Sequence, residues 1–372
     1  MISFVNLPAL NNSIREELQE SLSKYIDRTD YILGEDVELF EKEFAEYIGT
    51  KYAVGVSSGT DALFLALKTL DIDWDDGEYL SSAIVPVNTF TATALAVKRL
   101  GGRIHFVDIE EGMYQMDPDK LDDACNSVDA SVIIPVHLYG QGCSTKIIEI
   151  AKKYDLPIIE DCAQAHGSWC LGLNKRVGSI GQCGCFSFYP SKNLGGFGDG
   201  GMITTDDEGI YKKLRMLRNY GQKVKYEHIG EGYNMRLDTI QASILRVKLR
   251  HLDKWNDRRL QIAKLYNELL EDVDEVITPE IRGYHVFHLY VLRVKRRNEL
   301  LKFLNENEIQ CGIHYPVPLH LQDTYKNQGY EKGDFPVAEQ VADEIISLPM
   351  CLMLKDEEIE TVVGKIKEFY NK

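Results

Sequence analysis

The chain lacks any hydrophobic run long enough to cross a membrane. No apolar stretch approaches the roughly 20 residues that a membrane-spanning helix needs. Its first residues, Met1-Ile2-Ser3-Phe4-Val5-Asn6, also lack the charged and apolar regions of a signal peptide. We therefore expect a cytoplasmic protein with no membrane partner.

Basic residues are outnumbered, and paired cysteine motifs are missing. The 42 Lys and Arg residues against 58 Asp and Glu residues give a net charge of −16, which argues against a nucleic-acid-binding surface. An anionic small substrate is not excluded, because a local cluster of cations can oppose the overall field. The eight cysteines form no C-x-x-C pair and are not a disulfide framework in a chain this long, so we expect reduced thiols and no metal site.

Helix-like and strand-like segments alternate from about residue 36 to residue 210. Helices are expected at Glu38–Tyr47, Asp61–Leu70 and Thr91–Leu100, and strands at Tyr52–Val56, Ile84–Val87, Arg103–Val107, Ser131–Val136, Leu156–Ile159 and Gly201–Thr205. This alternation predicts an α/β fold with a mixed, mostly parallel sheet. In such a sheet, ligands bind beyond the carboxyl ends of the strands.

The C-terminal third predicts a second, smaller α/β domain. Helical apolar spacing from Leu237 to about Leu270 predicts one long bridging helix. It is followed by segments that read as a strand at His288–Val294 and as helices near Asn298–Asn305, Val337–Ile346 and Asp356–Tyr370. We therefore expect a large domain over residues 1–250 and a small one over residues 251–372.

Lys192 lies in a run dense with glycine, serine and aromatic residues, Phe186-Ser187-Phe188-Tyr189-Pro190-Ser191-Lys192-Asn193-Leu194-Gly195-Gly196. Such a loop suits an amine that reacts with an aldehyde better than a solvated surface charge. Upstream, an apolar strand ends at Asp161. Pyridoxal 5'-phosphate (PLP) needs a lysine for a Schiff base and a carboxylate opposite its pyridine nitrogen. Alone, these residues would be a surface lysine and a capping aspartate; together they predict a PLP site.

Three residues are candidates for holding the cofactor phosphate. Gly59 and Thr60 follow a strand and open a helix, where free N–H groups and the helix dipole attract anions. An ordinary helix cap explains this segment equally well in isolation, but the PLP-type lysine favours a phosphate cup. Ser187 is a second candidate donor.

Phe90 and Gln164 are candidates for contacts with the cofactor ring. Phe90 lies in a polar turn after a strand, and an aromatic face suits a flat pyridine ring. Gln164 follows Asp161 closely and is expected to donate to the phenolic oxygen of the cofactor. His166 is better explained as a packed or orienting histidine than as a catalyst.

Two segments are candidates for substrate binding. Asn234 and Arg236 stand just before the long helical pattern, and arginine suits capture of phosphate or carboxylate. His314, Tyr315 and His320 share a proline-rich loop. The competing idea of a metal site there is weak, because no carboxylate accompanies the two histidines.

Together these segments resemble the DegT/DnrJ/EryC1/StrS family of sugar aminotransferases, which are fold-type I PLP enzymes. The resemblance covers nearly the whole chain and rests on the motifs S-S-G-T-D-A, T-F-x-A-T, E-D-x-A-Q-A-H-G, S-F-Y-P-x-K-N-L-G, G-D-G-G and N-x-R-L-D. It implies that Lys192 carries the cofactor and then acts as acid and base, and that Asp161 pairs with the pyridine nitrogen. It assigns the remaining cofactor contacts to Gly59, Thr60, Phe90, Gln164 and Ser187.

The resemblance also implies a homodimer with shared active sites. In the family, the asparagine of N-x-R, here Asn234, reaches the cofactor phosphate of the neighbouring subunit. The segment Tyr31-Ile32-Leu33-Gly34 belongs to the same pattern. The residues expected at the substrate are then Tyr31, Arg236, His314, Tyr315 and His320.

The finer resemblance is to members that aminate C-3 of a dTDP-linked 3-keto-6-deoxyhexose. The tyrosine and proline before Lys192 and the Y-P-x-P-L-H-L-Q loop carry this resemblance. It implies L-glutamate as the amino donor and a 3-amino-3,6-dideoxy sugar for a surface polysaccharide. The alternatives are a UDP-linked 2-acetamido-3-keto uronic acid, whose carboxylate Arg236 would bind, a nucleotide-linked 4-keto sugar, and a non-catalytic PLP-binding regulator. The C-4 configuration, gluco or galacto, stays open.

Overall fold

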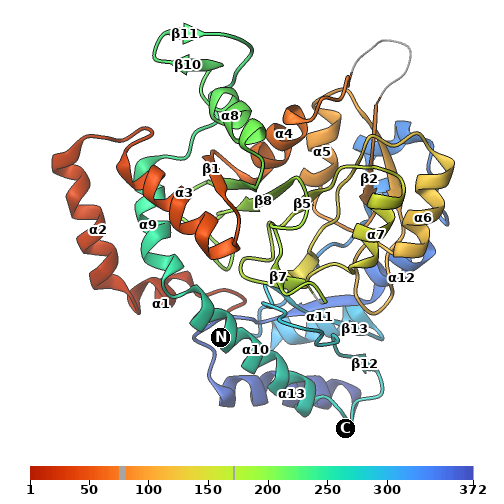
Figure 1. The fold of residues 1–372 in the computed structure, drawn as a ribbon. Helices are drawn as coiled ribbons and strands as arrows, with labels where there is room; N and C mark the ends of the chain where they lie inside the picture. Colours follow the sequence, from red (N-terminus) through yellow and green to blue (C-terminus); the bar gives the residue numbers. More distant parts are fainter. Residues whose placement is uncertain (75–80, 171, 372) are drawn as a thin grey trace.

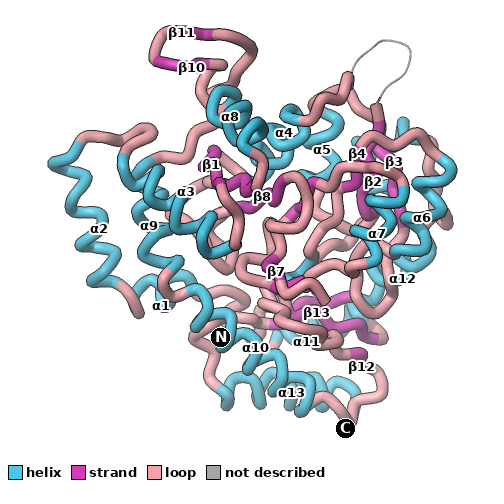
Figure 2. The backbone as a smooth tube through the Cα atoms, in the orientation of Figure 1, coloured by secondary structure: helices cyan, strands magenta, loops and turns pink. Residues whose placement is uncertain are grey.

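The computed structural model describes residues 1–74, 81–170 and 172–371, and its centre is a mixed sheet (Figures 1 and 2). The strands are β1 (Tyr52–Val56), β2 (Ser82–Pro86), β3 (Arg103–Val107), β4 (Val132–Ile133), β5 (Ile159–Asp161), β8 (Cys183–Ser187) and β9 (Gly201–Thr205). Parallel bridges between Ile133 and Ile158 and between Val136 and Asp161 join the two halves, so the order is β3-β2-β4-β5-β8-β9-β1. Only β9 runs antiparallel to its neighbours in this sheet.

Successive side chains of a strand point to opposite faces of the sheet. Helices pack against the side chains of both faces. Cys185 and Ile203 pack with helix α4 (Gly59–Thr69), while the adjacent Phe186 and Met202 pack with α3 (Glu35–Ile48) and α9 (Thr239–Leu249). Near β2 to β4, the cover is provided by α5 (Ala92–Lys98), α6 (Pro118–Ser127) and α7 (Lys146–Lys153). The outer elements are α1 (Leu7–Asn12), α2 (Arg15–Arg28), α8 (Glu208–Leu217), the hairpins β6 (Trp169–Cys170)–β7 (Lys175–Arg176) and β10 (Gln222–Val224)–β11 (Glu227–His228), and the short helix η1 (Leu138–Gly140).

The C-terminal part adds an antiparallel sheet of β12 (Val276–Ile277), β13 (Tyr290–Val294) and β14 (Ile345–Leu348). One face of this sheet packs against α10 (Leu252–Leu269), α11 (Arg297–Glu306) and α13 (Asp356–Tyr370). Residues of its other face join the core of the large sheet, together with η2 (Leu319–Leu321), η3 (Asp323–Gln328) and α12 (Pro336–Glu344). The domain boundary near residue 250 stays a prediction.

The predicted long helix from Leu237 to about Leu270 is wrong in one respect. The structure has two helices, α9 and α10, with a break at Arg250–His251. Both break residues keep right-handed helical dihedrals, so the apolar stripe continues from one helix into the next. Spacing alone therefore did not reveal the break.

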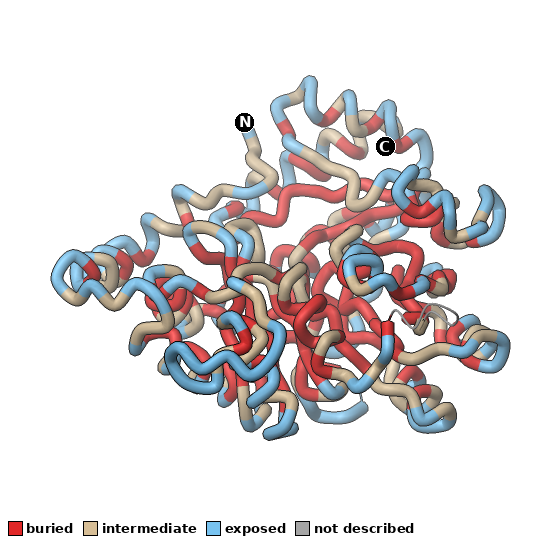
Figure 3. The backbone as a smooth tube through the Cα atoms, turned by 90° about the horizontal axis from the view of Figure 1, so that it is seen from above, coloured by how far each residue is buried: buried red, intermediate tan, exposed pale blue. Residues whose placement is uncertain are grey.

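Several strands escaped the sequence patterns: the short strands β6, β7, β10, β11 and β12, and also β14 and β8. Ile345 and Ile346 were expected at the end of a helix, but they begin β14, which pairs with β13. Strand β8 was hidden because Cys183-Gly184-Cys185 carries little β-branched character. Burial is concentrated around the central sheet (Figure 3), and among the described residues no helix is long and apolar enough to cross a membrane.

Candidate active site

A cavity of about 550 Å³ lies where parallel strands of the sheet end. The chain after β1 brings Ser58 and Gly59, the chain after β2 brings Phe90, and β5 ends at Asp161 itself. The loop after β8 brings Lys192. Residues far apart in sequence meet here because parallel strands share one carboxyl edge.

The Lys192 side chain reaches this cavity from a tight loop. Its backbone N–H donates to the Tyr189 carbonyl at 2.8 Å, which fixes the turn. Burial lowers the pKa of the Lys192 ammonium to about 8, against the opposing effect of the Asp161 carboxylate. A substantial fraction of the amine is therefore neutral near that pH, as a nucleophile or a general base requires.

Asp161 is held rigidly at the end of β5. Its Oδ2 accepts a hydrogen bond from the Thr93 hydroxyl at 2.7 Å, and its Oδ1 accepts one from the Ala163 N–H at 3.1 Å. Burial raises the pKa of Asp161, and the Thr93 and Ala163 hydrogen bonds and the Lys192 cation oppose that shift. A cationic partner at this carboxylate would therefore be strongly favoured.

The start of α4 forms an anion cradle on the cavity wall. The Ser58 hydroxyl caps the helix by accepting from the Asp61 N–H at 3.1 Å, and Gly59 and Thr60 line the cavity. A Cβ at Gly59 would lie 2.6 Å from the Ser187 Cβ, so only glycine lets the helix start approach β8 this closely. Backbone N–H groups at such a terminus bind phosphate readily.

Gln164, Tyr139 and Tyr315 form a hydrogen-bonded group beside Asp161. Gln164 Oε1 accepts from the Tyr139 N–H at 2.7 Å, and its Nε2 donates to the Tyr315 hydroxyl at 3.1 Å. These two bonds fix the amide orientation. Phe90 lies against the Tyr315 ring with a centroid distance of 5.7 Å and is 53% exposed, so its face is open to a ligand.

The two histidines of the C-terminal loop have different surroundings. His314 lines the cavity, bonds Ser347 Oγ through Nδ1 at 2.8 Å and stacks on Phe4. Burial, reinforced by the Lys192 cation, lowers the pKa of His314 to about 4, so its ring is neutral. His320 is buried away from the cavity and pairs with Glu339 at 3.0 Å.

Tyr31, Asn234 and Arg236 lie outside this cavity in the single chain. Arg236 lines a second cavity of about 990 Å³ beside the β10–β11 hairpin, which projects from the molecule (Figure 1). Arg236 Nη1 donates to Asn219 Oδ1 at 3.0 Å, and Asn234 and Tyr31 are exposed. The structure thus brings together nine of the predicted residues: Gly59, Thr60, Phe90, Asp161, Gln164, Ser187, Lys192, His314 and Tyr315.

Several residues at the site were not predicted from the sequence. Thr93 does not line the cavity but holds Asp161, and its place in the T-F-x-A-T motif was a usable signal. Arg259, His288 and Tyr189 line the cavity. Nothing in the local sequence around Arg259 distinguishes it from the many charged residues of a helix.

A buried group behind Asp161 has the composition of a metal site. His137 Nε2, a Glu160 oxygen and Cys162 Sγ lie within 4.8 Å of one another. However, His137 Nδ1 accepts from the Cys143 N–H, so Nε2 donates to Glu160 at 2.9 Å. The other acceptor positions of Glu160 are filled by the N–H groups of Gly178, Ile180 and Gly181. We interpret the group as a structural support for β5.

The residues of the first cavity fit PLP. The cavity offers an amine with a lowered pKa at Lys192, an anchored carboxylate at Asp161 and an anion cradle at Gly59. The open face of Phe90 suits a flat ring. This combination is the set of groups that the cofactor requires.

The chain matches the model of the DegT/DnrJ/EryC1/StrS aminotransferase family over residues 12–367. It is 42% identical over 372 residues to a dTDP-3-amino-3,6-dideoxy-alpha-D-galactopyranose transaminase of Aneurinibacillus thermoaerophilus, covering 99% of both chains. It is also 42% identical over 376 residues to a protein of Geobacillus stearothermophilus named pleiotropic regulatory protein, covering 98% of this chain and 99% of that one. A UDP-N-acetyl-3-dehydro-alpha-D-glucosamine 3-aminotransferase of Acidithiobacillus ferrooxidans is 40% identical over 368 residues, with 98% and 97% covered.

Solved structures agree with this placement. DesV of S. venezuelae in complex with a ketimine intermediate superimposes with a TM-score of 0.93 at 37% identity, covering 100% of this chain and 99% of that one. NtdA of Bacillus subtilis with bound cofactor PMP gives a TM-score of 0.91 at 29% identity, covering 100% of this chain and 85% of that one. The predicted fold class and cofactor are confirmed. The chain belongs to the DegT/DnrJ/EryC1/StrS family and is a PLP-dependent nucleotide-sugar aminotransferase.

Proposed function

We propose that this enzyme aminates C-3 of a dTDP-linked 3-keto-6-deoxyhexose, with L-glutamate as the expected donor. The observation that carries the proposal is the 42% identity, over 99% of both chains, to a transaminase named for a dTDP-linked 3-amino-3,6-dideoxygalactose. The C-terminal loop, which carries the finer resemblance, places His314 and Tyr315 in the cavity with Lys192. The 3-amino-3,6-dideoxy product would serve a surface polysaccharide, and the enzyme would act in the cytoplasm.

Each cavity residue has a defined task in this reaction. When bound, PLP supplies an aldehyde carbon that takes up the amino group and a ring that withdraws electrons. The start of α4, with Gly59 and Thr60, binds the phosphate, and the Phe90 face covers the ring. Asp161, fixed by Thr93, holds a proton-bearing ring nitrogen in place. Lys192 Nζ, with its pKa lowered to about 8, would accept a proton from the α-carbon of the amino-acid donor and return it to the aldehyde carbon of the cofactor.

Tyr315 and His314 are proposed to contact the sugar. The Tyr315 hydroxyl is already oriented by Gln164, and burial raises the pKa of this phenol to about 12, so it stays a hydrogen-bond donor. His320 is engaged with Glu339 and braces the loop instead. A site built to bond a hydroxyl rejects analogues that lack it, so the choice between gluco and galacto epimers should be sharp.

The active site is proposed to form between two copies of the chain. Tyr31, Asn234 and Arg236 lie outside the Lys192 cavity, while Phe90 and Tyr189 at the cavity mouth are 53% and 55% exposed. We infer that a second copy of the chain covers this part of the surface. In a homodimer, the N-x-R segment of one copy would reach the phosphate and sugar at the other.

The decisive experiment runs the reaction in reverse. The PLP form is offered dTDP-3-amino-3,6-dideoxyglucose, its galactose epimer, the 4-amino isomers and a UDP-2-acetamido-3-amino uronate, and conversion to the aminated cofactor is followed by absorbance. We expect conversion only with a dTDP-linked 3-amino sugar. Conversion of only a UDP-linked or only a 4-amino sugar would overturn the proposed substrate.

The second candidate function is regulation, because one relative carries a regulatory name. The lowered pKa of Lys192 and the hydrogen bond from Thr93 to Asp161 support the enzyme. A protein that binds PLP but aminates no sugar and accepts no amino donor would instead support the regulator.

A further inference from the structure

His288 lines the active-site cavity together with Lys192, but the proposed chemistry gives it no task. It stands just before β13, and its Nδ1 hydrogen-bonds the Oδ1 of Asn193, the residue that follows Lys192, at 3.2 Å. Either ring nitrogen of a neutral histidine can carry the hydrogen, so the tautomer decides what the ring offers to a ligand. The contacts of Asn193 determine that tautomer.

The amide of Asn193 is held in one orientation. It is buried, and its Nδ2 donates to the Val286 carbonyl and to Asn256 Oδ1, each at 2.9 Å. Asn256 is also buried, and its Nδ2 donates to the His166 carbonyl at 2.8 Å. Main-chain carbonyl oxygens therefore fix both amides, because turning either one over would place an oxygen against an oxygen.

This series of hydrogen bonds assigns the hydrogen on the His288 ring. Both hydrogens of Asn193 Nδ2 are used and its Oδ1 can only accept, so His288 Nδ1 is the donor. Burial lowers the pKa of His288 well below its usual value, and the cations of Lys192 and Arg259 act in the same direction. The ring is therefore neutral at neutral pH, and its Nε2 carries a lone pair without a hydrogen.

The lone pair of His288 Nε2 is available to a ligand. In the part of the chain that the structure describes, the one hydrogen bond of the His288 ring is made by Nδ1, and the ring is partly exposed on the cavity wall. His314 on the same wall is different, because its Nδ1 meets the Ser347 hydroxyl, which can donate or accept. The tautomer of His288 is thus fixed by its surroundings, whereas that of His314 is not.

The acceptor at His288 complements the other polar groups of the cavity. The Arg259 guanidinium and the N–H groups at the start of α4 can only donate. Asp161 already accepts two hydrogen bonds, Gln164 Oε1 accepts one, and Asp199 is exposed to solvent. A lone pair repels the oxygens of phosphate and carboxylate groups, so His288 suits a neutral group that donates a hydrogen.

We propose that His288 Nε2 accepts a hydrogen bond from a hydroxyl of the keto sugar next to the reacting carbon, at C-2 or C-4. The inference rests on the proposed function, in which the C-3 carbonyl reacts near Lys192 and a hydroxyl flanks it on either side. A hydroxyl that leaves water needs an acceptor for its hydrogen. L-Glutamate has no hydroxyl beside its amino group, so His288 serves the sugar half of the reaction alone.

Two substitutions separate the roles of the two ring nitrogens. In His288→Asn, the amide nitrogen takes the place of Nδ1 and keeps the bond to Asn193, but nothing replaces Nε2. In His288→Gln, the amide oxygen can take the place of Nε2. His285→Asn is the control, because His285 is buried and does not line the cavity. Its Nδ1 accepts from the Phe287 N–H at 2.9 Å, which an amide oxygen can also do.

The PLP forms of these enzymes are assayed in single turnovers with four substrates. These are the dTDP-3-amino-3,6-dideoxy sugar that the unchanged enzyme accepts, its 2-deoxy analogue, its 4-deoxy analogue, and L-glutamate. We expect His288→Asn to lower the second-order rate constant for the full sugar roughly tenfold, the loss expected when one hydrogen bond to a buried hydroxyl is removed.

The same variant should match the unchanged enzyme on the one analogue that lacks the contacted hydroxyl. Its reaction with L-glutamate and its cofactor absorbance should also be unchanged. His288→Gln should recover most of the lost rate with the full sugar. His285→Asn should convert all four substrates normally.

Three results would overturn the inference. His288→Asn could convert the full sugar normally, or it could lose the same factor on the full sugar and on both deoxy analogues, which would exclude contact with either hydroxyl. An equal loss with L-glutamate would show that His288 acts on Lys192 or on the cofactor, which both half-reactions share. If the unchanged enzyme converts the full sugar, any of these results defeats this inference alone. If it converts no dTDP-linked 3-amino sugar, the proposed function fails.

Discussion

Two buried lysines with the same lowered pKa permit a controlled test of the reactive amine. Burial lowers the pKa of both Lys192 and Lys248 to about 8, but Lys248 Nζ donates to the Gly195 carbonyl and does not line the cavity. Lys192→Ala should fold, lose the covalently held cofactor and lose its visible absorbance. Lys248→Ala should keep that absorbance. A yellow Lys192→Ala protein, stable to gel filtration, would contradict the assignment of Lys192.

The pKa of Lys192 also predicts how activity depends on pH. Proton transfer needs the neutral amine, so the rate of the half-reaction should rise as pH rises through about 8 and then level off. Single-turnover measurements with L-glutamate from pH 6.5 to about 9.5 test this expectation. A rate that is constant across that range would show that Lys192 is neutral throughout, or that its proton transfer is not rate-limiting.

Thr93 is predicted to position Asp161. Thr93→Val keeps the side-chain volume but removes the hydroxyl that donates to Asp161 at 2.7 Å. The loss of a hydrogen bond to a charged group corresponds to about 2 kcal/mol, or roughly a thirtyfold lower kcat. Thr93→Ser should restore most of the rate. If Val and Ser variants behave alike, Thr93 contributes only packing.

The sequence was sufficient to predict the residues whose chemistry is distinctive. Lys192, Asp161 and Gln164 were predicted because each stands in a local pattern that a PLP enzyme requires, and all three line the cavity. The position of Arg259 at the site depends on contacts with residues far away in the chain, the carbonyls of Phe287 and Met350. Spacing in the sequence does not encode those distances.

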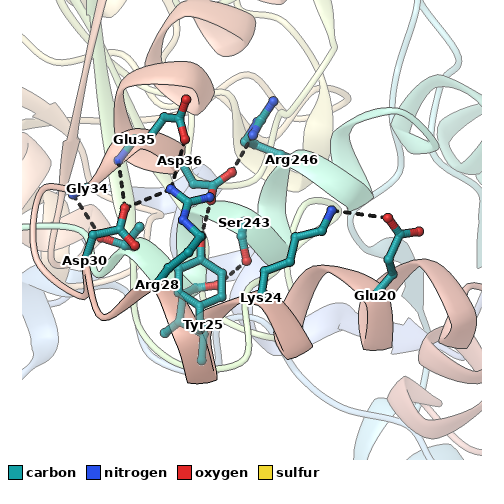
Figure 4. Close-up of polar contacts among 12 residues, drawn as sticks. Glu20, Lys24, Tyr25, Arg28, Asp30, Gly34, Glu35, Asp36, Ser243 and Arg246 are labelled. Carbon is teal, nitrogen blue, oxygen red and sulfur yellow. Dashed lines mark hydrogen bonds and ion pairs between the residues drawn. The ribbon is translucent and has the colours of Figure 1, made fainter.

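At the scale of elements, a polar network fastens α2 to α3 and α9 (Figure 4). The Tyr25 hydroxyl of α2 donates to Asp36 of α3, which also pairs with Arg28 and with Arg246 of α9. Tyr25 is only 4% exposed, so this hydroxyl has no ready replacement from water. The network fixes α2 at the edge of the molecule by polar contacts in addition to apolar packing.

Tyr25→Phe should lower the free energy of unfolding by about 1 kcal/mol, because Asp36 keeps two cationic partners. Hydrogen exchange should increase mainly in α2. The control lies one residue away: Lys24→Met removes the exposed Lys24–Glu20 pair, 3.2 Å long, and should change stability by less than about 0.5 kcal/mol. Equal effects of the two substitutions would contradict this account.

Helices and strands were predictable where the end of the apolar periodicity coincided with turn-forming residues. β1, β3 and β9 have the predicted bounds, as does α13. The break between α9 and α10 was missed because Arg250 and His251 retain helical dihedrals. β14 was missed because its buried isoleucines directly follow a helix and continue the apolar pattern of that helix. Only the pairing with β13 shows that they form a strand.

At the scale of the whole molecule, buried histidines predict sensitivity to acid. Burial lowers the pKa of His166 and His285 to about 3 and that of His314 to about 4, from 6.5. Between these values the unfolded chain binds more protons than the folded one, so stability falls as pH falls from about 6.5 toward 3. The raised pKa values of Asp161, Glu110 and His137 act in the opposite direction, while the lowered pKa values of His288 and His105 add to the loss of stability in acid.

Urea unfolding at several pH values between about 7.5 and 5 measures this slope. His166→Leu should make the slope shallower, because leucine fits among Phe186 and Phe188 and cannot be protonated. The comparison concerns the slope rather than the absolute stability, so a general cost of the substitution does not affect the result. An unchanged slope would show that His166 does not control the response to acid.

The separation of the predicted site residues within one chain leads to the last prediction. Lys192 and Asn234 lie in different regions of a protomer, and the proposed dimer brings the Asn234 of one copy to the Lys192 of the other. Lys192→Ala and Asn234→Ala proteins should each be nearly inactive. Mixed dimers should regain activity, because one of their two sites then carries both changes and the other carries neither. Native mass spectrometry confirms that mixed dimers form. If they form and stay inactive, each copy completes its own site, and the proposal of shared sites is wrong.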